Sequence, residues 1–306
     1  MIDYTNLKTL LRIKNIKLSS LSNTLNISSK TLSKINKNEK IANHVLVKIA
    51  NFLEINVSEI SEYVPDNPLL ARLQSEKNSK ISTGIYNKLQ VDLTYNSNKI
   101  EGSSLSQEQT YFIFNTKTIG VNSSNILVDD IIETSNHFRA VDYVIEMAEV
   151  EISEVIIKEL HKIIKQSTSA ENIPYFKIGD YKAIDNEVGG RDTASVADTP
   201  IKIKELISKY LKISNVTFND IIDFHYNFEI IHPFQDGNGR VGRLIMLKEC
   251  LKHNITPFII EDAEKEFYYR GLREYKAEPG FLKETCLHFQ DKFKESMKYF
   301  NIDYND

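Results

Sequence analysis

The sequence of 306 residues has no tryptophan and only two cysteines, Cys250 and Cys286. Two cysteines cannot build the dense disulfide framework of small secreted domains, and neither has the closely spaced partner of a zinc site. No apolar run approaches the roughly 20 residues of a membrane-spanning helix, and no basic segment followed by an apolar core opens the chain. These absences favour a protein of the reducing cytoplasm that makes no membrane contact.

Charge is distributed unevenly along the chain, whose formal net charge is −4. Residues 1–63 contain nine lysines and arginines against five acidic residues, a net charge of +4, and the rest of the chain is acidic. At about 100–200 residues per domain, the length predicts two domains, and the two prolines of residues 64–68 break helical structure between them. We therefore expect a basic domain over 1–63, a linker over 64–68 and a larger domain over 69–306.

Apolar residues at helical spacing in the first domain predict short helices over 6–14, 19–25, 29–36 and 42–53. The run from Leu18 to Asn38 resembles the helix-turn-helix of the phage-repressor (Cro/C1-like) family. The resemblance implies that the third helix enters the DNA major groove, leaving near bases or phosphates the residues Ser29, Lys30, Ser33, Lys34 and Lys37. The positive charge supports DNA binding, and a protein-docking module is the alternative.

One stretch of the second domain concentrates reactive side chains: residues 232–243 read His-Pro-Phe-Gln-Asp-Gly-Asn-Gly-Arg-Val-Gly-Arg. Gly237 and Gly239 flank Asn238 and can adopt positive φ, which lets successive backbone N–H groups converge on an anion. Apolar residues at helical spacing follow over 240–253, so the loop opens a helix whose N-terminus stabilises negative charge. The loop is therefore suited to bind phosphate.

Charged and titratable side chains beside this loop are suited to bind further phosphate oxygens, hold a metal ion and accept a proton. Arg240 and Arg243 are three residues apart on the predicted helix, so their guanidinium groups should point the same way, toward further phosphate oxygens. Asp236 supplies the carboxylate that Mg²⁺ uses together with substrate phosphates. His232 can accept a proton, because an unperturbed imidazole has a pKa of about 6.5. The segment thus predicts a polyphosphate site with a general base.

These residues match every fixed position of the signature His-x-Phe-x-(Asp/Glu)-Gly-Asn-Gly-Arg-x-x-Arg, so the second domain resembles the Fic family. The resemblance implies transfer of AMP from ATP to a Ser, Thr or Tyr hydroxyl of a protein, with pyrophosphate leaving. By this analogy His232 is the base, Asp236 holds Mg²⁺, and the phosphates are bound by Gly237, Asn238, Gly239, Arg240 and Arg243.

The run from Gly237 to Gly242 also spells the Gly-x-Gly-x-x-Gly of dinucleotide-binding folds, and Glu261 and Asp262 follow about twenty residues later. That fingerprint requires an apolar strand leading directly into the first glycine. Here a polar segment and a predicted helix precede it, and the chain lacks alternating strands and helices. We therefore disfavour a dinucleotide site.

A second motif lies upstream of the signature. Ser97 and Glu101 are four residues apart, so both should lie on one helix face, and Gly102 is a suitable helix stop. In a chain with the Fic signature, Ser-x-x-x-Glu-Gly resembles the family's inhibitory motif. The resemblance implies that Glu101 pairs with Arg243 and keeps this guanidinium from the γ-phosphate, which silences the resting enzyme. A capped surface helix with a solvated Glu101 is the alternative.

Two further assignments concern the protein target and the adenine. Helical spacing fails over 178–190, where glycines punctuate a predicted β-hairpin. In Fic proteins such a flap aligns the target by strand addition, which would make Ile184 and Val188 its apolar contacts; an ordinary surface hairpin is the alternative. Tyr268 and Tyr269 are expected to wall the adenine, as downstream aromatic residues often do in the family, and core packing is the alternative.

The rest of the second domain is predicted to be helical over 73–94, 107–115, 126–150, 154–165, 201–213, 217–231, 261–277 and 281–300. His137 and His161 lie on these helices without metal-type partners, so we interpret both as packing or surface residues. The predicted fold class is mainly α: a helix-turn-helix module plus an all-helical Fic core with a small β-hairpin flap.

These features predict a Mg²⁺- and ATP-dependent protein adenylyltransferase, autoinhibited by Glu101, whose target is another protein or the chain itself. Two alternatives stay open. The same site could remove AMP from a modified protein, with Glu101 positioning a water, or the Fic domain could be the nucleotide sensor of a DNA-binding regulator. Nothing in the loop reads a base, so the preference for ATP follows from the resemblance alone. A homo-oligomer is compatible with the sequence.

Overall fold

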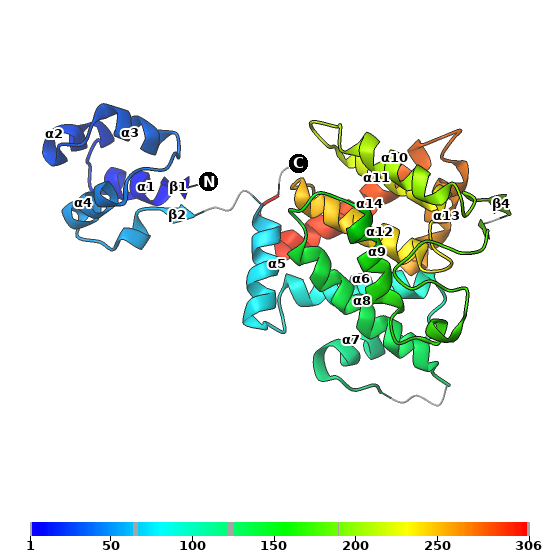
Figure 1. The fold of residues 1–306 in the computed structure, drawn as a ribbon. Helices are drawn as coiled ribbons and strands as arrows, with labels where there is room; N and C mark the ends of the chain where they lie inside the picture. Colours follow the sequence, from blue (N-terminus) through cyan, green and yellow to red (C-terminus); the bar gives the residue numbers. More distant parts are fainter. Residues whose placement is uncertain (1, 64–66, 121–124, 189, 305–306) are drawn as a thin grey trace. The chain divides into compact units, whose positions relative to one another are not determined.

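A computed structural model describes residues 2–63, 67–120, 125–188 and 190–304, and the chain divides into two compact units, Met1–Pro68 and Leu69–Asp306 (Figure 1). The structure is 64% helical, which confirms the mainly α fold class. None of the helices in the described ranges is long and apolar enough to cross a membrane.

The first unit packs four α-helices around one apolar core: α1 (Thr5–Ile13), α2 (Leu21–Leu25), α3 (Ser29–Asn36) and α4 (Asn43–Leu53). The 3₁₀ turn η1 (Leu18–Ser20) lies between α1 and α2, and a second, η2 (Val57–Glu59), follows α4. The hydroxyl of Ser28 caps α3 by accepting a hydrogen bond from the Thr31 amide. The sequence did not predict the antiparallel pair of β1 (Ile2–Asp3) and β2 (Glu62–Tyr63), which joins the two ends of the unit.

The second unit is an all-helical body with one small hairpin (Figure 1). Its helices are α5 (Pro68–Ser79), α6 (Ile85–Ile100), α7 (Gln107–Thr116), α8 (Val128–Glu146), α9 (Glu154–Lys165), α10 (Thr199–Tyr210), α11 (Phe218–Ile231), α12 (Asn238–Lys252), α13 (Lys265–Glu274) and α14 (Gly280–Tyr299), with 3₁₀ turns η3 (Ser169–Asn172) and η4 (Asp262–Glu264). Helix α12 is buried along most of its length and packs against α6, α8, α9 and α11. The signature residues therefore enter the centre of the unit.

The single helix predicted over 73–94 is wrong, because the chain breaks between α5 and α6. Lys80 adopts a left-handed conformation with φ 54°, which ends α5. The buried Glu76 carboxylate then accepts a hydrogen bond from the Tyr86 amide at 2.9 Å and caps the first turn of α6. A side chain at Gly84 would overlap that carboxylate. The apolar spacing continues across the break, which is why the sequence pattern did not reveal it.

The hairpin lies later in the chain than predicted. Strand β3 (Glu187–Val188) pairs antiparallel with β4 (Arg191–Asp192), in the register Glu187 with Asp192 and Val188 with Arg191. Gly190 has φ 73°, as a two-residue hairpin loop requires. Ile184 precedes β3 in an irregular segment, so only Val188 of the two predicted flap contacts lies on a strand.

Candidate active site

A cavity of about 430 Å³ surrounds the beginning of α12. It collects side chains that are far apart in the sequence, from the end of α6, from the hairpin, from α11 and its following loop, and from α13: Glu101, Val188, Thr193, Tyr226, Glu229, Ile230, His232, Gly239, Arg243, Tyr268, Tyr269, Leu272 and Arg273. The structure thus brings the predicted base, one predicted phosphate arginine and the predicted inhibitory carboxylate into one pocket.

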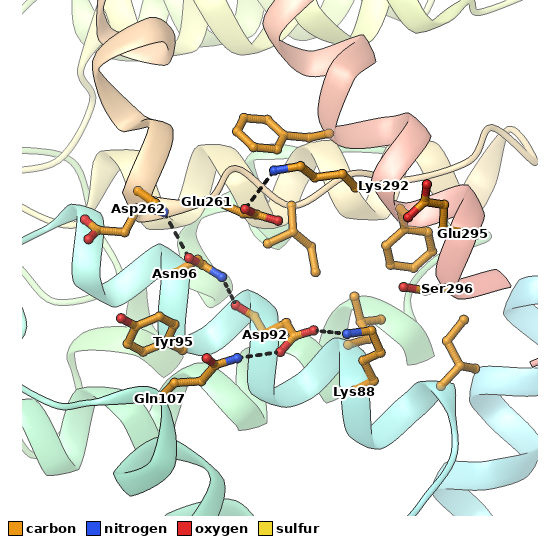
Figure 2. A pocket seen from close by; sticks show the side chains of 16 residues that line it. Lys88, Asp92, Tyr95, Asn96, Gln107, Glu261, Asp262, Lys292, Glu295 and Ser296 are labelled. Atoms are coloured by element: carbon orange, nitrogen blue, oxygen red, sulfur yellow. Dashed lines mark hydrogen bonds and ion pairs between the residues drawn. The ribbon is translucent and has the colours of Figure 1, made fainter. Parts of the chain in front are cut away.

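A larger cavity of about 650 Å³ lies elsewhere, between α6, α14 and the segment before α13. Figure 2 shows that both of its lysines pair with carboxylates of the same cavity, Lys88 with Asp92 and Lys292 with Glu261. None of its lining residues belongs to the signature. We therefore place the site in the smaller cavity, where reactive groups converge.

The signature loop is held by its own side chains. His232 ends α11 in the left-handed conformation with φ 49°, and Gly237 has φ 83° immediately before α12. The Asn238 amide closes the loop, since it accepts a hydrogen bond from the Phe234 N–H at 2.8 Å and donates one to the Phe234 carbonyl at 2.9 Å. Its side chain therefore shapes the loop, and only its backbone N–H faces an incoming anion at the helix N-terminus.

Gly239 differs from the expectation that both glycines adopt positive φ, because only Gly237 does so. Gly239 lies within the first turn of α12, where a Cβ would overlap the Glu101 carboxylate and lie 3.0 Å from the Arg243 side chain. Its absent side chain leaves the volume that Glu101 occupies in this structure. The sequence could not separate these two reasons for a glycine.

His232, the predicted base, is neutral at pH 7. Burial, followed by the positive charge of Lys182, lowers the pKa of His232 to about 4, although Glu101 and Asp236 act in the opposite direction. The imidazole is therefore unprotonated at pH 7 and has a free electron pair for a proton.

Arg243 is bound on three sides by the end of α6. Its Nε donates to the Ser97 hydroxyl at 3.0 Å, and its Nη2 donates to the Ser97 carbonyl at 2.9 Å and to the Glu101 carboxylate at 2.7 Å. Although burial opposes a charge there, Glu101 raises the pKa of Arg243, so the guanidinium is fully ionised. The contact that the inhibitory motif implies is present.

Arg240 makes a separate set of ion pairs, which contradicts the expectation that the two arginines reach toward one place. It contacts Glu133 on α8, and its Nη2 lies 3.2 Å from Asp236 Oδ2. Lys165 on α9 lies 2.5 Å from Glu133 and 2.7 Å from the same Asp236 oxygen. Two cations and two carboxylates from four elements thus fix the Asp236 side of the loop.

Asp236 fits a divalent cation by its charge and exposure. Burial opposes ionisation, but Arg240 and Lys165 lower the pKa of this carboxyl to about 2, so it is an anion at neutral pH. Its side chain is 49% exposed, and both ion pairs use Oδ2. Among the described residues, no three acidic, histidine or cysteine side chains gather as a complete metal site, so a cation here would need substrate phosphates as further ligands.

Sequence reasoning missed four charged residues around the site: Glu133, Lys165, Lys182 and Glu229. Glu229 lines the pocket one helical turn before His232, and burial raises the pKa of its carboxyl to about 8, so it is largely protonated at neutral pH. Its Oε1 is buried without a hydrogen-bond partner in the described part of the chain. In the sequence, the only indication of a role for Glu229 was its position three residues before His232, about one helical turn away.

The two residues predicted to contact adenine differ in exposure, since Tyr268 is buried and Tyr269 is partly exposed at the pocket wall. The Tyr268 ring is 1% exposed and its hydroxyl lies 2.8 Å from His225 Nε2, although the residue also lines the cavity. Tyr269 is 37% exposed, and its hydroxyl donates to the Ile100 carbonyl at the end of α6. Only Tyr269 offers an accessible aromatic face, and it also holds the inhibitory segment.

The predicted DNA-binding residues lie on or directly after α3. Ser29, Lys30, Ser33 and Lys37 are exposed and Lys34 is half-buried, while Leu32 and Ile35 face the core of the first unit. The exposed face of α3 is therefore polar and basic, as a groove-binding helix requires. His137 and His161 are fully buried, as packing residues are.

Comparison with known proteins agrees with this architecture. Residues 151–250 match the Fic/DOC family, and residues 6–66 match the Cro/C1-type HTH DNA-binding domain. The chain is 25% identical over 187 residues to a protein adenylyltransferase Fic of Drosophila erecta, a match that covers 58% of this chain and 36% of that protein. A probable protein adenylyltransferase of Aquifex aeolicus is 44% identical over 61 residues, or 20% of this chain and 18% of that protein.

The curated relatives are longer proteins, and this chain spans about a third of their length or less. Among solved structures, a Fic domain containing signaling protein from Bacteroides thetaiotaomicron superposes with a TM-score of 0.57 at 24% identity, over 75% of this chain and 90% of that one. This likeness shows a shared fold. The protein therefore carries a Fic domain, preceded in the same chain by a Cro/C1-type helix-turn-helix domain.

Proposed function

We propose that the second unit transfers AMP from ATP to a Ser, Thr or Tyr hydroxyl of a protein, depends on Mg²⁺ and is held inactive by Glu101. The observation that carries the proposal is a single pocket in which a neutral His232 and the N-terminus of α12 meet Arg243, with Glu101 on that arginine. The names of the curated relatives support the same reaction.

The chain's residues can each supply one part of this reaction. The N–H groups that open α12 bind phosphate oxygens, and Arg243 binds the outer phosphates once Glu101 leaves it. The hydroxyl oxygen of the target attacks the α-phosphorus while its proton passes to His232, and the bond from the α-phosphorus to the oxygen of the β-phosphate breaks, releasing pyrophosphate. Asp236 would hold Mg²⁺, which neutralises charge on the α- and β-phosphates when bound.

Inhibition follows from the same contacts. A carboxylate bound to Arg243 removes the guanidinium that would orient the γ-phosphate, so ATP cannot align for in-line attack. The Glu101 carboxylate also occupies the space above Gly239, next to the phosphate-binding N–H groups. Removing Glu101 therefore frees both the arginine and the volume beside it.

The decisive experiment compares the wild type, Glu101→Gly and Glu101→Gly/His232→Ala with Mg²⁺ and α-labelled ATP. We expect label on protein in the single mutant, little in the wild type and none in the double mutant. Transfer of γ-label would instead identify phosphorylation. If no variant retains label but Glu101-containing protein strips AMP from a pre-labelled sample, the reaction is AMP removal, with Glu101 positioning the water.

A second function is favoured by the first unit, whose exposed α3 residues are basic. We propose that residues 1–63 bind DNA, with Ser29, Lys30, Ser33, Lys34 and Lys37 at bases or phosphates.

Lys30→Ala should weaken binding to all DNA sequences. It should also reduce the slope of log K against the logarithm of the salt concentration by about one unit, because one phosphate contact is lost. Lys14→Ala, outside α3, is the control. Equal binding of duplex DNA by Lys30→Ala and the wild type would contradict the placement of Lys30 at a phosphate.

A further inference from the structure

Lys182 is a buried lysine beside the signature loop to which neither the sequence nor the proposed reaction gives a task. The residue is 2% exposed and its backbone N–H donates to the Pro233 carbonyl at 2.9 Å, next to His232. Its Nζ donates to the Asn186 side-chain oxygen at 2.7 Å and to the Thr193 hydroxyl at 2.6 Å. These two partners are the residues immediately before β3 and after β4.

The root of the hairpin is therefore joined to both sides of the catalytic loop. The Thr193 hydroxyl donates to the Asn186 carbonyl at 2.8 Å, which closes the hairpin above Lys182. The Asn186 amide donates to the Phe234 carbonyl at 3.0 Å. On the other side of His232, the Ala194 N–H donates to the Ile231 carbonyl at 3.3 Å. The hairpin thus straddles His232 and cannot shift without loosening the loop.

Charge makes this lysine unusual. Among the described residues no carboxylate lies within ion-pair distance of Nζ, whose two partners are neutral oxygens. Burial lowers the pKa of Lys182 to about 8, although Asp185 favours its charged form. A buried cation without an ion pair is expensive to keep and is most simply explained by a functional task.

The groups that face His232 come from several elements. Lys182 disfavours the imidazolium, whereas Glu101 from α6 and Asp236 from the loop favour it, and Glu229 contributes its backbone carbonyl. Lys182 is thus the cation in this group that opposes two carboxylates. Because both carboxylates lie close by, His232 would gain protons more readily without that lysine.

We propose that Lys182 is a positioning residue that fixes the hairpin across His232, and that its positive charge adds to burial in lowering the affinity of the imidazole for a proton. The inference builds on the proposed role of His232 as base. The two tasks share one side chain but depend on different properties of it: hydrogen bonding for the hairpin, and charge for the imidazole.

Four variants separate these properties. Lys182→Met removes both, Lys182→Arg keeps the charge, Thr193→Val removes one partner of Nζ and keeps the charge, and Lys177→Met removes an exposed lysine of the same segment as the control. Each is measured in the full chain, without nucleotide, so the result does not depend on AMP transfer. Circular dichroism establishes the pH range over which each variant stays folded.

The first readout is the titration of His232 by NMR of ¹³C-labelled histidine, with His232→Ala to assign the signal. We expect its midpoint to rise by about half a pH unit or more in Lys182→Met and to stay unchanged in Lys182→Arg, Thr193→Val and Lys177→Met. An unchanged midpoint in folded Lys182→Met would overturn the electrostatic task.

The second readout is amide hydrogen exchange of a peptide covering the hairpin. Exchange should be about tenfold faster in Lys182→Met and Thr193→Val, close to the wild-type rate in Lys182→Arg, and unaffected in Lys177→Met. Wild-type exchange in both Lys182→Met and Thr193→Val would overturn the positioning task. If both readouts move as expected while Glu101→Gly transfers no AMP, the inference about Lys182 stands and the proposed function fails.

Discussion

Arg243 has two uses that exclude each other in time. In the structure its donors are taken by Ser97 and Glu101, and in the proposed reaction they bind phosphate. Such a shared donor couples inhibition to nucleotide binding, since any phosphate that reaches Arg243 must displace a carboxylate of the same charge. In the proposed mechanism, the inhibitory carboxylate therefore lies within the site that it controls.

This double use predicts the behaviour of a double mutant. Glu101→Gly/Arg243→Ala should transfer AMP about 100-fold more slowly than Glu101→Gly, because the lost guanidinium is not replaced when the inhibitor is gone. Label transfer from α-labelled ATP is the measurement. Equal activity of the two proteins would show that Arg243 serves inhibition alone.

Ser97 should contribute to inhibition by a smaller amount. Its hydroxyl supplies one of three hydrogen bonds to Arg243, and its carbonyl remains after substitution. We expect Ser97→Ala to raise basal transfer by about tenfold, since a hydrogen bond to a charged group is worth about 1.5–3 kcal/mol. The activity of Glu101→Gly sets the upper limit, and a wild-type rate in Ser97→Ala would mean that the hydroxyl makes no contribution.

At the level of single residues, the sequence predicted those groups whose role is chemical and local. His232, Gly239, Glu101 and Arg243 come together because the signature and the helix spacing carry that information. Lys182 and the Glu133 and Lys165 pairs stayed hidden, because their partners are brought close only by tertiary packing between helices. Asn238 was assigned to phosphate because the sequence could not show that its side chain closes the loop.

At the level of elements, α6 matters most because the residues proposed to inhibit transfer lie at its C-terminal end. The buried Glu76 carboxylate of α5 caps the N-terminus of α6, where the N-cap residue Gly84 has no side chain to do so. The Tyr269 hydroxyl links the end of α6 to α13, and Asn96 links its middle to η4 by accepting a hydrogen bond from the Asp262 amide at 2.9 Å. The position of Glu101 is thus determined by a whole helix.

The cap from Glu76 gives a stability prediction. Glu76→Ala leaves the Tyr86 amide buried without a partner, which should lower the free energy of unfolding by about 1–3 kcal/mol. Urea denaturation followed by circular dichroism measures the change. Glu149→Ala, at an exposed position, is the control and should stay within about 0.5 kcal/mol of the wild type. An equally small effect of Glu76→Ala would show that α6 does not need this cap.

The boundaries of helices and strands show which structural features the spacing of apolar residues does not predict. The helical period predicted α9 and α11 closely because the Ser153 and Thr217 side chains cap their first turns, and it predicted α12 because apolar residues continue along this buried helix. It failed at residues 80–84, since the residues on both sides stay apolar at helical spacing while the break is made by backbone geometry and by Glu76. The position of the hairpin was also predicted wrongly, because it depends on the glycine turn and not on the spacing of apolar residues.

At the level of the whole molecule, three buried histidines and the half-buried His232 link stability to pH. Burial lowers the pKa of His137, His161 and His225 to about 3 and that of His232 to about 4. Between these values and about 6.5, the unfolded chain binds protons that the folded chain does not. Unfolding then takes up protons, so stability is lost as the pH falls through this range.

We therefore expect the free energy of unfolding to fall below pH 6.5 with a slope of about 1.4 kcal/mol per pH unit for each such histidine. Glu229 acts in the opposite sense, because its raised pKa contributes stability at low pH that is lost as the pH rises toward 8. Urea unfolding at pH 7.5, 6.0 and 5.0 tests the balance, and His161→Gln should flatten the curve. His44→Gln, at an exposed position, should leave its slope unchanged. A stability independent of pH over this interval would contradict the neutral state of the buried imidazoles.

The short segment that holds Arg243 also has a genetic consequence. In the proposed mechanism inhibition depends on residues 97–102 and transfer on the pocket that Glu101 lines, so we expect substitutions in that segment to raise activity and substitutions of the other pocket residues to lower it. Where uncontrolled AMP transfer harms the host cell, a gene encoding Glu101→Gly would survive only with a second change that disables transfer. Sequencing the survivors would then map the catalytic residues by selection, and His232, Arg243 and the glycines of the loop should be hit most often.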